Sequence, residues 1–108
     1  MPTATEDPQS EELARAFKAL SNPMRVRILH WLKDPGSFPP QSEPAEEVGV
    51  CLKHIQARAG VSQSTASQYM ATLQDAGLVT SQRIGAWTHY RRVEDRIARL
   101  AEELAATV

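Results

Sequence analysis

Cysteine, aromatic residues and long apolar runs are scarce in this chain of 108 residues. The single cysteine excludes a disulfide within the chain and favours a reducing compartment. No N-terminal apolar run resembles a signal peptide, and no apolar stretch approaches the ~20 residues that span a bilayer. We therefore expect a cytoplasmic protein without a membrane partner.

The chain is also too short for two hydrophobic cores. A domain of this size buries roughly two-thirds of the surface that its unfolded chain exposes, which supports one modest core. This length argues against a two-domain enzyme. Catalytic arrangements are missing as well, because no Ser-His-Asp set, Cys-His pair, glycine-rich phosphate loop or pair of carboxylates can be assembled from these residues. We expect one soluble domain that is not an enzyme and needs no cofactor.

The formal net charge of -1 hides an uneven distribution. Residues 13–37 and residues 50–92 each carry a net charge of +4, and the acidic residues gather in 1–12, 38–49 and 93–108. Basic stretches of this kind suit a nucleic-acid partner, but they also suit the solvated faces of ordinary helices. The charge pattern alone does not choose between the two interpretations.

The first third of the sequence predicts a tail followed by two helices. Residues 1–10 are polar and lack apolar periodicity, which is typical of a disordered tail, and residues 11–108 form the domain. The first helix follows the tail with Ser10 as its cap, and the second starts at Pro23, whose missing N–H costs nothing in a first turn. Residues 35–44 hold four of the seven prolines, so this connection continues neither helix.

The rest of the chain alternates between helix and strand signals. Apolar residues recur at helical spacing in some segments, and β-formers are concentrated in others. The predicted elements are a short strand at 48–51, a helix at 52–59, a helix at 63–76, strands at 78–84 and 87–93, and a last helix that follows them.

The middle of this order matches a helix-turn-helix with a wing. The turn 59–62 joins two helices and contains Gly60, which permits a sharp change of direction. A hairpin with arginines at both ends follows, with Arg83 before its turn and Arg91 and Arg92 after it. The ordered set predicts a mainly α (α+β) winged helix-turn-helix, in the order α-α-(β)-α-α-β-β-α.

In such a domain the second helix, residues 63–76, fits the DNA major groove, and the wing, residues 79–92, lies over flanking phosphates. Gln can bond bidentately to adenine, and Ser and Thr reach bases or phosphates. The predicted contacts with double-stranded DNA are Gln63, Ser64, Thr65, Ser67, Gln68, Arg83 and Arg91. The sequence thus predicts a DNA-binding transcriptional regulator. A winged helix used only for protein contact is the alternative, which the arginines oppose.

Four motifs resemble those of the ArsR/SmtB family of winged-helix repressors. The similarity covers roughly residues 11–100. The motifs are LSNPMRVRIL at 20–29, VSQSTASQYM at 61–70, LQDAGLV at 73–79 and RIGAWTHY at 83–90. Family members often carry Lys or Arg where this chain has Thr65 and Gln68, so we expect less affinity from recognition-helix charge here and more from the wing and the helix ends.

The resemblance implies a homodimer that binds an inverted repeat in a promoter and represses transcription. It also implies that the first and last helices form the dimer interface. The matching positions are Leu13, Phe17, Ile97, Leu100 and Leu104. The same stripe suits the core of a single chain equally well. The operator, the effector and the choice between repression and activation stay open.

Metal sensing, which is common in that family, finds no support in these residues. Cys51 stands where the first of two paired cysteines would fall, but Lys53 stands at the second position and would repel a metal ion. Residues 93–108 contain no histidine for the other familiar site. Cys51 is either a small buried apolar residue or a redox switch whose reactive thiolate is favoured by the nearby cations. His54 and His89 are expected to be structural or surface groups.

Overall fold

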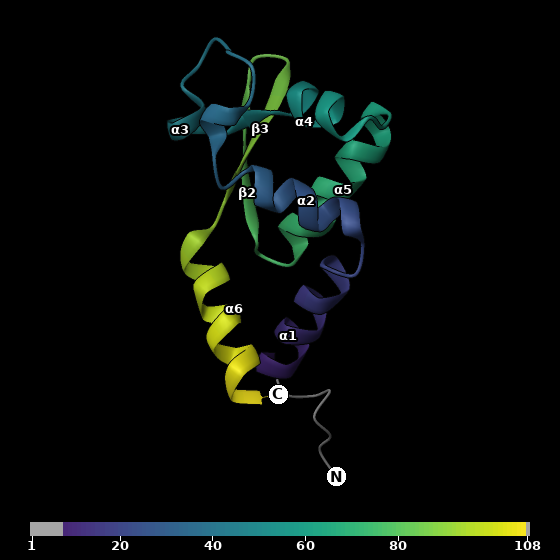
Figure 1. Cartoon of the computed structure of the whole chain (residues 1–108), viewed down its shortest axis with the longest axis vertical. Helices are drawn as coiled ribbons and strands as arrows, with labels where there is room; N and C mark the ends of the chain where they lie inside the picture. Colours follow the sequence, from purple (N-terminus) through teal and green to yellow (C-terminus); the bar gives the residue numbers. More distant parts are fainter. Residues whose placement is uncertain (1–7, 108) are drawn as a thin grey trace.

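The computed structural model describes residues 8–107, and Figure 1 shows how the chain is arranged. The described part of the chain forms the predicted winged helix-turn-helix domain. It contains three strands and six helices, one helix more than the sequence predicts. The elements in chain order are α1 (Pro8–Ala19), α2 (Pro23–Trp31), the 3-10 turn η2 (Pro35–Ser37), α3 (Ala45–Val48), β1 (Val50–Cys51), α4 (Leu52–Ala59), α5 (Gln63–Asp75), β2 (Val79–Ile84), β3 (Trp87–Arg92) and α6 (Glu94–Thr107).

Helix α1 begins earlier than the sequence predicts. It starts at Pro8, so residues 8–10 are helical rather than part of a tail, and Ser10 lies in the first turn instead of capping it. A proline favours this earlier start because its fixed φ angle suits a first turn. The other residues of the predicted tail, 1–7, lie outside the described residues. Helix α2 begins at Pro23 as predicted, and the side chain of Asn22 accepts hydrogen bonds from the first free N–H groups of that helix.

The connection between α2 and α4 is ordered by contacts that are distant in sequence. The amide nitrogen of Gln41 donates to the carbonyl of Gly49 at 2.9 Å, and its oxygen accepts from the N–H of Cys51 at 3.0 Å. Helix α3, which the sequence did not predict, takes up Val48, so the predicted strand is shortened to two residues. Gly49 has a φ of 96°, and a Cβ there would lie 2.5 Å from the Tyr90 carbonyl oxygen, so only glycine fits.

The three strands form an antiparallel sheet in the order β1-β3-β2. The sequence predicts the hairpin of β2 and β3 and a short strand at 48–51, and the structure shows that this strand, β1, pairs with β3 through Val50 and Tyr90. Gly85 and Ala86 form the two-residue turn between β2 and β3, and Gly85 has a φ of 61°, as the first central position of a type II′ turn requires. Burial raises the pKa of the Tyr90 phenol above its ordinary value of 10.

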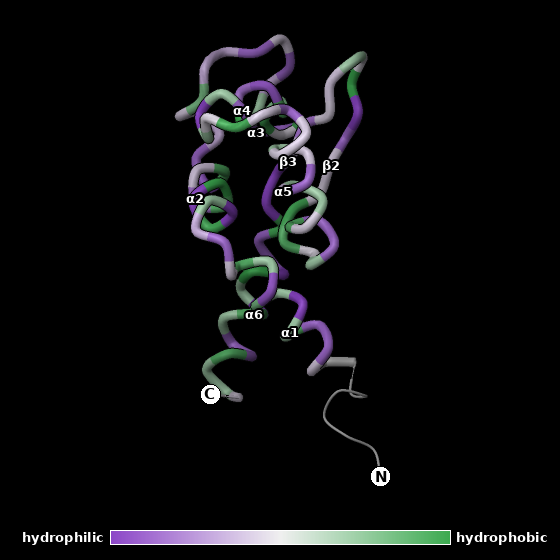
Figure 2. Tube along the Cα trace, turned by 90° about the vertical axis from the view of Figure 1, so that its right-hand side faces the viewer, coloured by the Kyte–Doolittle hydropathy of each residue, from purple (hydrophilic) through white to green (hydrophobic). Residues whose placement is uncertain are grey.

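The core lies where α2, α4 and α5 meet the sheet. Its largest fully buried side chains are Ile28, Ile55, Met70, Leu73, Leu78 and Val50. Helices α1 and α6 project from this body side by side toward one end, which gives extents of 52 × 24 × 23 Å (Figures 1 and 2). No helix among the described residues is both long and apolar enough to cross a membrane. The two projecting helices are referred to below as the arm.

A buried arginine ties the arm together. Arg96 of α6 is 8% exposed, and its guanidinium lies 3.8 Å from a carboxylate oxygen of Glu12 on α1 and 3.5 Å from one of Glu103 on α6. Its alkyl chain packs beside Gly77, directly after α5. The arm is therefore connected to the end of the helix-turn-helix through one side chain.

Candidate nucleic-acid interface

The helix-turn-helix has the predicted boundaries except at its end, where α5 stops at Asp75 and Ala76 is the C-cap instead of the last helical residue. Helix α4 ends where Gly60 adopts the left-handed conformation, with a φ of 69°. Ser62 caps α5, because its hydroxyl oxygen accepts a hydrogen bond from the N–H of Thr65 at 3.1 Å. A left-handed glycine ends α4 and a serine cap starts α5, so local interactions place the turn between the two helices.

Helix α5 has one buried face and one exposed face. Ala66, Met70 and Leu73 are fully buried in the core. Of the residues that the sequence predicts to contact DNA, those exposed on this helix are Gln63, Ser64, Ser67 and Gln68. Thr65 differs, since it is half-buried and its hydroxyl oxygen accepts a hydrogen bond from Ser62 at 2.9 Å. The structure thus brings four hydrogen-bonding side chains to one surface and holds the fifth in the cap.

The arginines of the wing do not form a single group. Arg83 is exposed near the tip of the hairpin, paired with Thr88, and its Nε donates to the carbonyl of Gly85 at 3.2 Å. Arg91 is paired with Thr80 nearer the base, about 10 Å away along the strands at ~3.4 Å per residue. Because paired residues share a face and faces alternate along a strand, the two arginines lie on opposite faces of the hairpin.

Two of the basic residues near the wing base bind to the protein itself. Arg91 donates to the carbonyl of Glu47 in α3 at 2.9 Å. Arg92 binds the Glu94 carboxylate at 3.0 Å and donates to the carbonyl of Leu29 at 3.3 Å. Among the described residues, Arg83 near the tip forms no ion pair, and its hydrogen bond goes to Gly85 in its own hairpin. The opposite faces of Arg83 and Arg91 could have been found from the sequence, because the two-residue turn at Gly85 fixes the pairing.

Other basic residues that the charge count included have packing roles. The guanidinium of Arg58 lies 4.6 Å from the ring centre of Trp31 and 4.8 Å from that of Phe38. Arg25 donates to the carbonyl of Ala19 at 2.6 Å and lies 5.8 Å from the ring centre of Tyr69. Cation-π packing of this kind stabilises the domain and holds these guanidinium groups against aromatic rings. A charge count over a segment cannot separate such residues from free ones.

The five residues of the predicted dimer stripe fall into two groups. Leu13 and Leu100 are buried within the single chain, at 9% and 8% exposure, and Ile97 is partly buried. Phe17 and Leu104 are exposed, at 43% and 39%. The stripe therefore serves the core of one chain and also leaves an apolar surface on the arm. The sequence interpretation left both possibilities open; burial in the single chain accounts for Leu13 and Leu100, and a dimer contact stays a prediction for Phe17 and Leu104.

Cys51 is a free thiol with 3% exposure, and its N–H donates to Gln41. A buried cysteine of this kind packs as a small apolar residue. Lys53 and His54, its predicted activators, follow it on α4. Within residues 8–107, no group of three or more His, Cys, Asp or Glu side chains lies close enough to hold a metal ion.

Comparison with known proteins places this geometry in a group of regulators. A model of the IclR helix-turn-helix domain matches residues 45–83, which run from α3 into β2. The chain is 41% identical over 99 residues to the uncharacterized HTH-type transcriptional regulator YbzH of Bacillus subtilis, covering 90% of this chain and 99% of the relative. It is 30% identical to the biofilm growth-associated repressor of Agrobacterium fabrum, covering 98% of this chain and 80% of the relative.

Solved structures show the same fold over nearly the whole chain. An ArsR-like transcriptional regulator from Rhodococcus sp. RHA1 is 25% identical, with a TM-score of 0.66 and coverage of 93% of this chain and 82% of that one. The homodimeric winged helix-turn-helix domain Mb0332 from Mycobacterium bovis is 24% identical, with a TM-score of 0.68 and coverage of 97% and 86%. On its fold and its similarity to YbzH, the chain belongs to the HTH-type transcriptional regulators with a winged-helix fold.

Proposed function

We propose that this regulator is an ArsR-type repressor that binds an inverted repeat of double-stranded DNA as a homodimer. The observation that carries the proposal is the polar face of α5, where Gln63, Ser64, Ser67 and Gln68 are all exposed over the first two turns. In Figure 1 these turns and the tip of the wing both lie in the upper part of the molecule, at the end away from the arm.

The face has the chemistry needed to read bases. A glutamine amide can donate to N7-bearing adenine edges and accept from their amino groups, and serine hydroxyls can do either. Helix α5 supplies no cation of its own, because residues 63–75 contain no Lys or Arg. Affinity for phosphates must then come from neighbouring elements, and Arg83 at the wing tip is the best placed of the predicted contacts. Arg91, tied to α3, contributes less.

The arm is the proposed dimer interface. Phe17 on α1 and Leu104 on α6 leave apolar surface exposed on two helices that project together from the body. A second copy would cover both, and the structural neighbour Mb0332 is homodimeric. A two-fold dimer presents two copies of α5, which matches an inverted repeat with two half-sites. Ile97 would contribute at the margin of this interface, with Leu13 and Leu100 supporting it from within the chain.

The ArsR assignment is supported by the sequence motifs and by the ArsR-like neighbour from Rhodococcus. The match to the IclR model spans only the helix-turn-helix and the first wing strand, so it does not describe α1 or α6. The similarity to the Agrobacterium repressor covers nearly the whole chain and favours repression as the direction of regulation.

Fluorescence anisotropy tests the proposed function. The protein is titrated against a labelled duplex from its own upstream region and against a scrambled duplex of the same composition, over a series of salt concentrations. We expect tighter binding to the upstream duplex, with an affinity that falls as salt rises because bound phosphates release counterions. Failure to bind any duplex at low salt would overturn the proposal and favour a winged helix that contacts protein only.

A further inference from the structure

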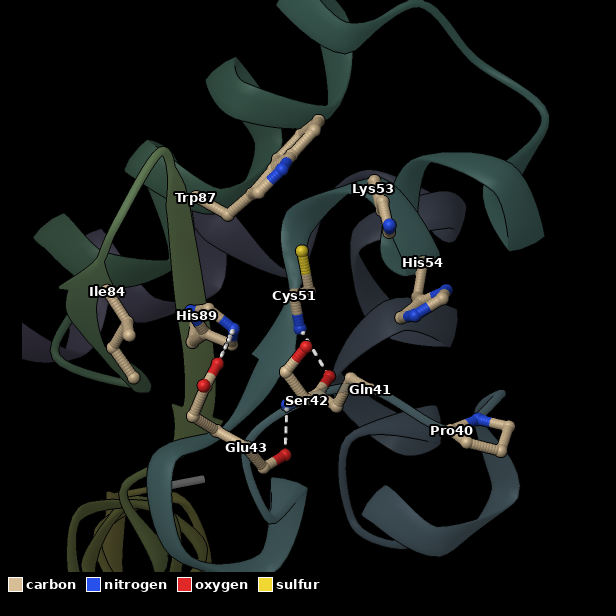
Figure 3. Close-up of a pocket in the computed structure, with 10 residues that line it drawn as sticks. All are labelled: Pro40, Gln41, Ser42, Glu43, Cys51, Lys53, His54, Ile84, Trp87 and His89. Carbon is tan, nitrogen blue, oxygen red and sulfur yellow. Dashed lines mark hydrogen bonds and ion pairs between the residues drawn. The ribbon is translucent and has the colours of Figure 1, made fainter.

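A pocket of about 450 Å³ lies on the side of the sheet that faces the connection between α2 and α4 (Figure 3). Three parts of the chain form its walls. The connection contributes residues 40–43, β1 and the start of α4 contribute Cys51, Lys53 and His54, and the wing contributes Ile84, Trp87 and His89. The pocket therefore lies between the first helix of the helix-turn-helix and the wing.

Two imidazole nitrogens in these walls have no hydrogen-bond partner in the described part of the protein. His89 is 4% exposed, and its Nδ1 has no hydrogen-bond partner, while its Nε2 lies 4.0 Å from a carboxylate oxygen of Glu43. The buried Nε2 of His54 also has no partner. Buried polar atoms in proteins are nearly always hydrogen-bonded, so two unpartnered imidazole nitrogens at one pocket indicate a missing partner. The sequence gave no indication of this pocket, since its three walls come together only in the fold.

The remaining groups define what that partner would be. The Lys53 ammonium lies 5.8 Å from the ring centre of Trp87, so a cation and an aromatic face meet at the pocket. Ile84 adds apolar surface beside Trp87. Gln41 is not available to a ligand, because both ends of its amide already bind the backbone. The pocket thus combines a flat apolar wall with donors for an anion.

We propose that this pocket binds a small aromatic carboxylate. Its ring would pack on Trp87 and Ile84, and its carboxylate would accept from the Lys53 ammonium and, once the imidazole turns toward the pocket, from the Nε2 of His54. A hydroxyl group on the ring could form hydrogen bonds with His89 and Glu43, which lie next to each other in the pocket. A bound ring would connect Lys53 of α4 to Trp87 of the wing and so fix the wing relative to α4 and α5. The binding itself does not depend on DNA, but its effect on DNA affinity rests on the proposed function.

Amide NMR spectroscopy of the full chain tests the binding. Benzoate, 3-hydroxybenzoate and indole-3-carboxylate are the probes, with benzamide as the uncharged analogue and inorganic phosphate as the anion without a ring. The two indole N–H signals provide an internal control, because Trp87 lines the pocket and Trp31 packs on Arg58 away from it. We expect a saturable shift of the Trp87 signal with a Kd of about 1 mM or lower, and little change at Trp31.

The variant Lys53→Met removes the ammonium group and keeps an unbranched side chain that is one atom shorter. It is expected to weaken carboxylate binding about tenfold, as the loss of one charge-assisted hydrogen bond implies. Lys33→Met is the matched control, because Lys33 is equally an exposed lysine but does not line this pocket. No shift of Trp87 with any probe up to about 10 mM, equal binding of benzamide or phosphate, or unchanged binding in Lys53→Met would overturn the proposal.

The effect on DNA is measured separately by repeating the anisotropy titration with the best probe at saturation. We expect the affinity for the upstream duplex to change severalfold in the wild type and to stay unchanged in Lys53→Met. A probe that binds without changing the DNA affinity would overturn the regulatory part alone. If the protein bound the probe but no DNA, the proposed function would be contradicted, and the proposal that the pocket binds an aromatic carboxylate would still hold.

Discussion

The two ends of the molecule distribute their polar and apolar residues in opposite ways. On α5, the hydrogen-bonding side chains of Gln63 and Gln68 are exposed, and the apolar residues are buried. On the arm, the apolar side chains of Phe17 and Leu104 are exposed, and a charged residue, Arg96, is buried. Figure 2 shows apolar residues along both projecting helices. A surface that exposes donors and acceptors suits a polar partner, and one that exposes apolar side chains suits another protein surface.

The largest effect is expected from placing charge on the exposed part of the arm. The double variant Phe17→Asp, Leu104→Asp should be monomeric by light scattering. Each chain would place two carboxylates in the proposed interface, where they would face the same two carboxylates of the second copy. DNA affinity should fall by about 100-fold or more, since each half-site would then be bound by a single chain. Val26→Asp is the control, because Val26 is 44% exposed on α2 and lies outside the arm. A double variant that remains dimeric would place the interface elsewhere.

A smaller effect is expected inside the arm. Arg96→Met should lower the free energy of unfolding in urea by about 2–3 kcal/mol, because it leaves the buried Glu103 carboxylate with a weaker partner. Arg99→Met should cost less than about 1 kcal/mol, since Arg99 is 58% exposed and also reaches Glu103. Both are compared at one protein concentration, because dimerisation contributes to stability. Equal losses in the two variants would show that burial of Arg96 adds nothing.

On α5, contacts with DNA bases are expected in the first two turns and not at the end of the helix. Gln63→Ala or Gln68→Ala should weaken binding to the preferred duplex by about 1–3 kcal/mol and largely spare random DNA. Gln74→Ala is the matched control, because Gln74 is also an exposed glutamine but stands in the last turns of α5. Anisotropy on both duplexes measures the difference. If the two duplexes lost affinity equally, these residues would have no part in reading the sequence.

The smallest effects are expected at the wing, where two arginines can be compared. Arg83→Ala should weaken binding to every duplex and lower the slope of log K against log salt by about 1, as the loss of one phosphate contact implies. Arg91→Ala should change the slope less, because its side chain lies on the opposite face and donates to Glu47. Salt titrations of both variants provide the test. Identical slopes of log K against log salt would contradict the claim that Arg83 at the wing tip contacts phosphate more than Arg91 at the base.

The sequence predicts best what short-range interactions determine. The end of α4 and the start of α5 follow from Gly60 and Ser62, whose effects on the backbone are local. Helix α3 and the pairing of β1 with β3 were missed, because they depend on Gln41 binding Gly49 and Cys51 across the proline-rich connection. No periodicity in the sequence reports such contacts.

In the candidate site too, the sequence predicts features that local patterns determine and misses contacts between distant residues. Helical periodicity identified the outward face of α5, since exposure there follows directly from the apolar stripe. It could not show that Thr65 is bound in the cap or that Arg91 is tied to α3. Burial of Arg96 was also unpredictable, because arginine is usually exposed and its partner Glu12 is on another helix.

Hydroxyl-radical footprinting on the upstream DNA tests the central claim most directly, because it reports both the reading of DNA and the dimer. The account predicts two protected half-sites of inverted sequence with centres about 10 base pairs apart or a multiple of that spacing, as two copies of α5 in successive major grooves require. The double variant Phe17→Asp, Leu104→Asp should lose one or both. Protection of a single half-site by the wild type, or uniform protection without sequence preference, would contradict the account.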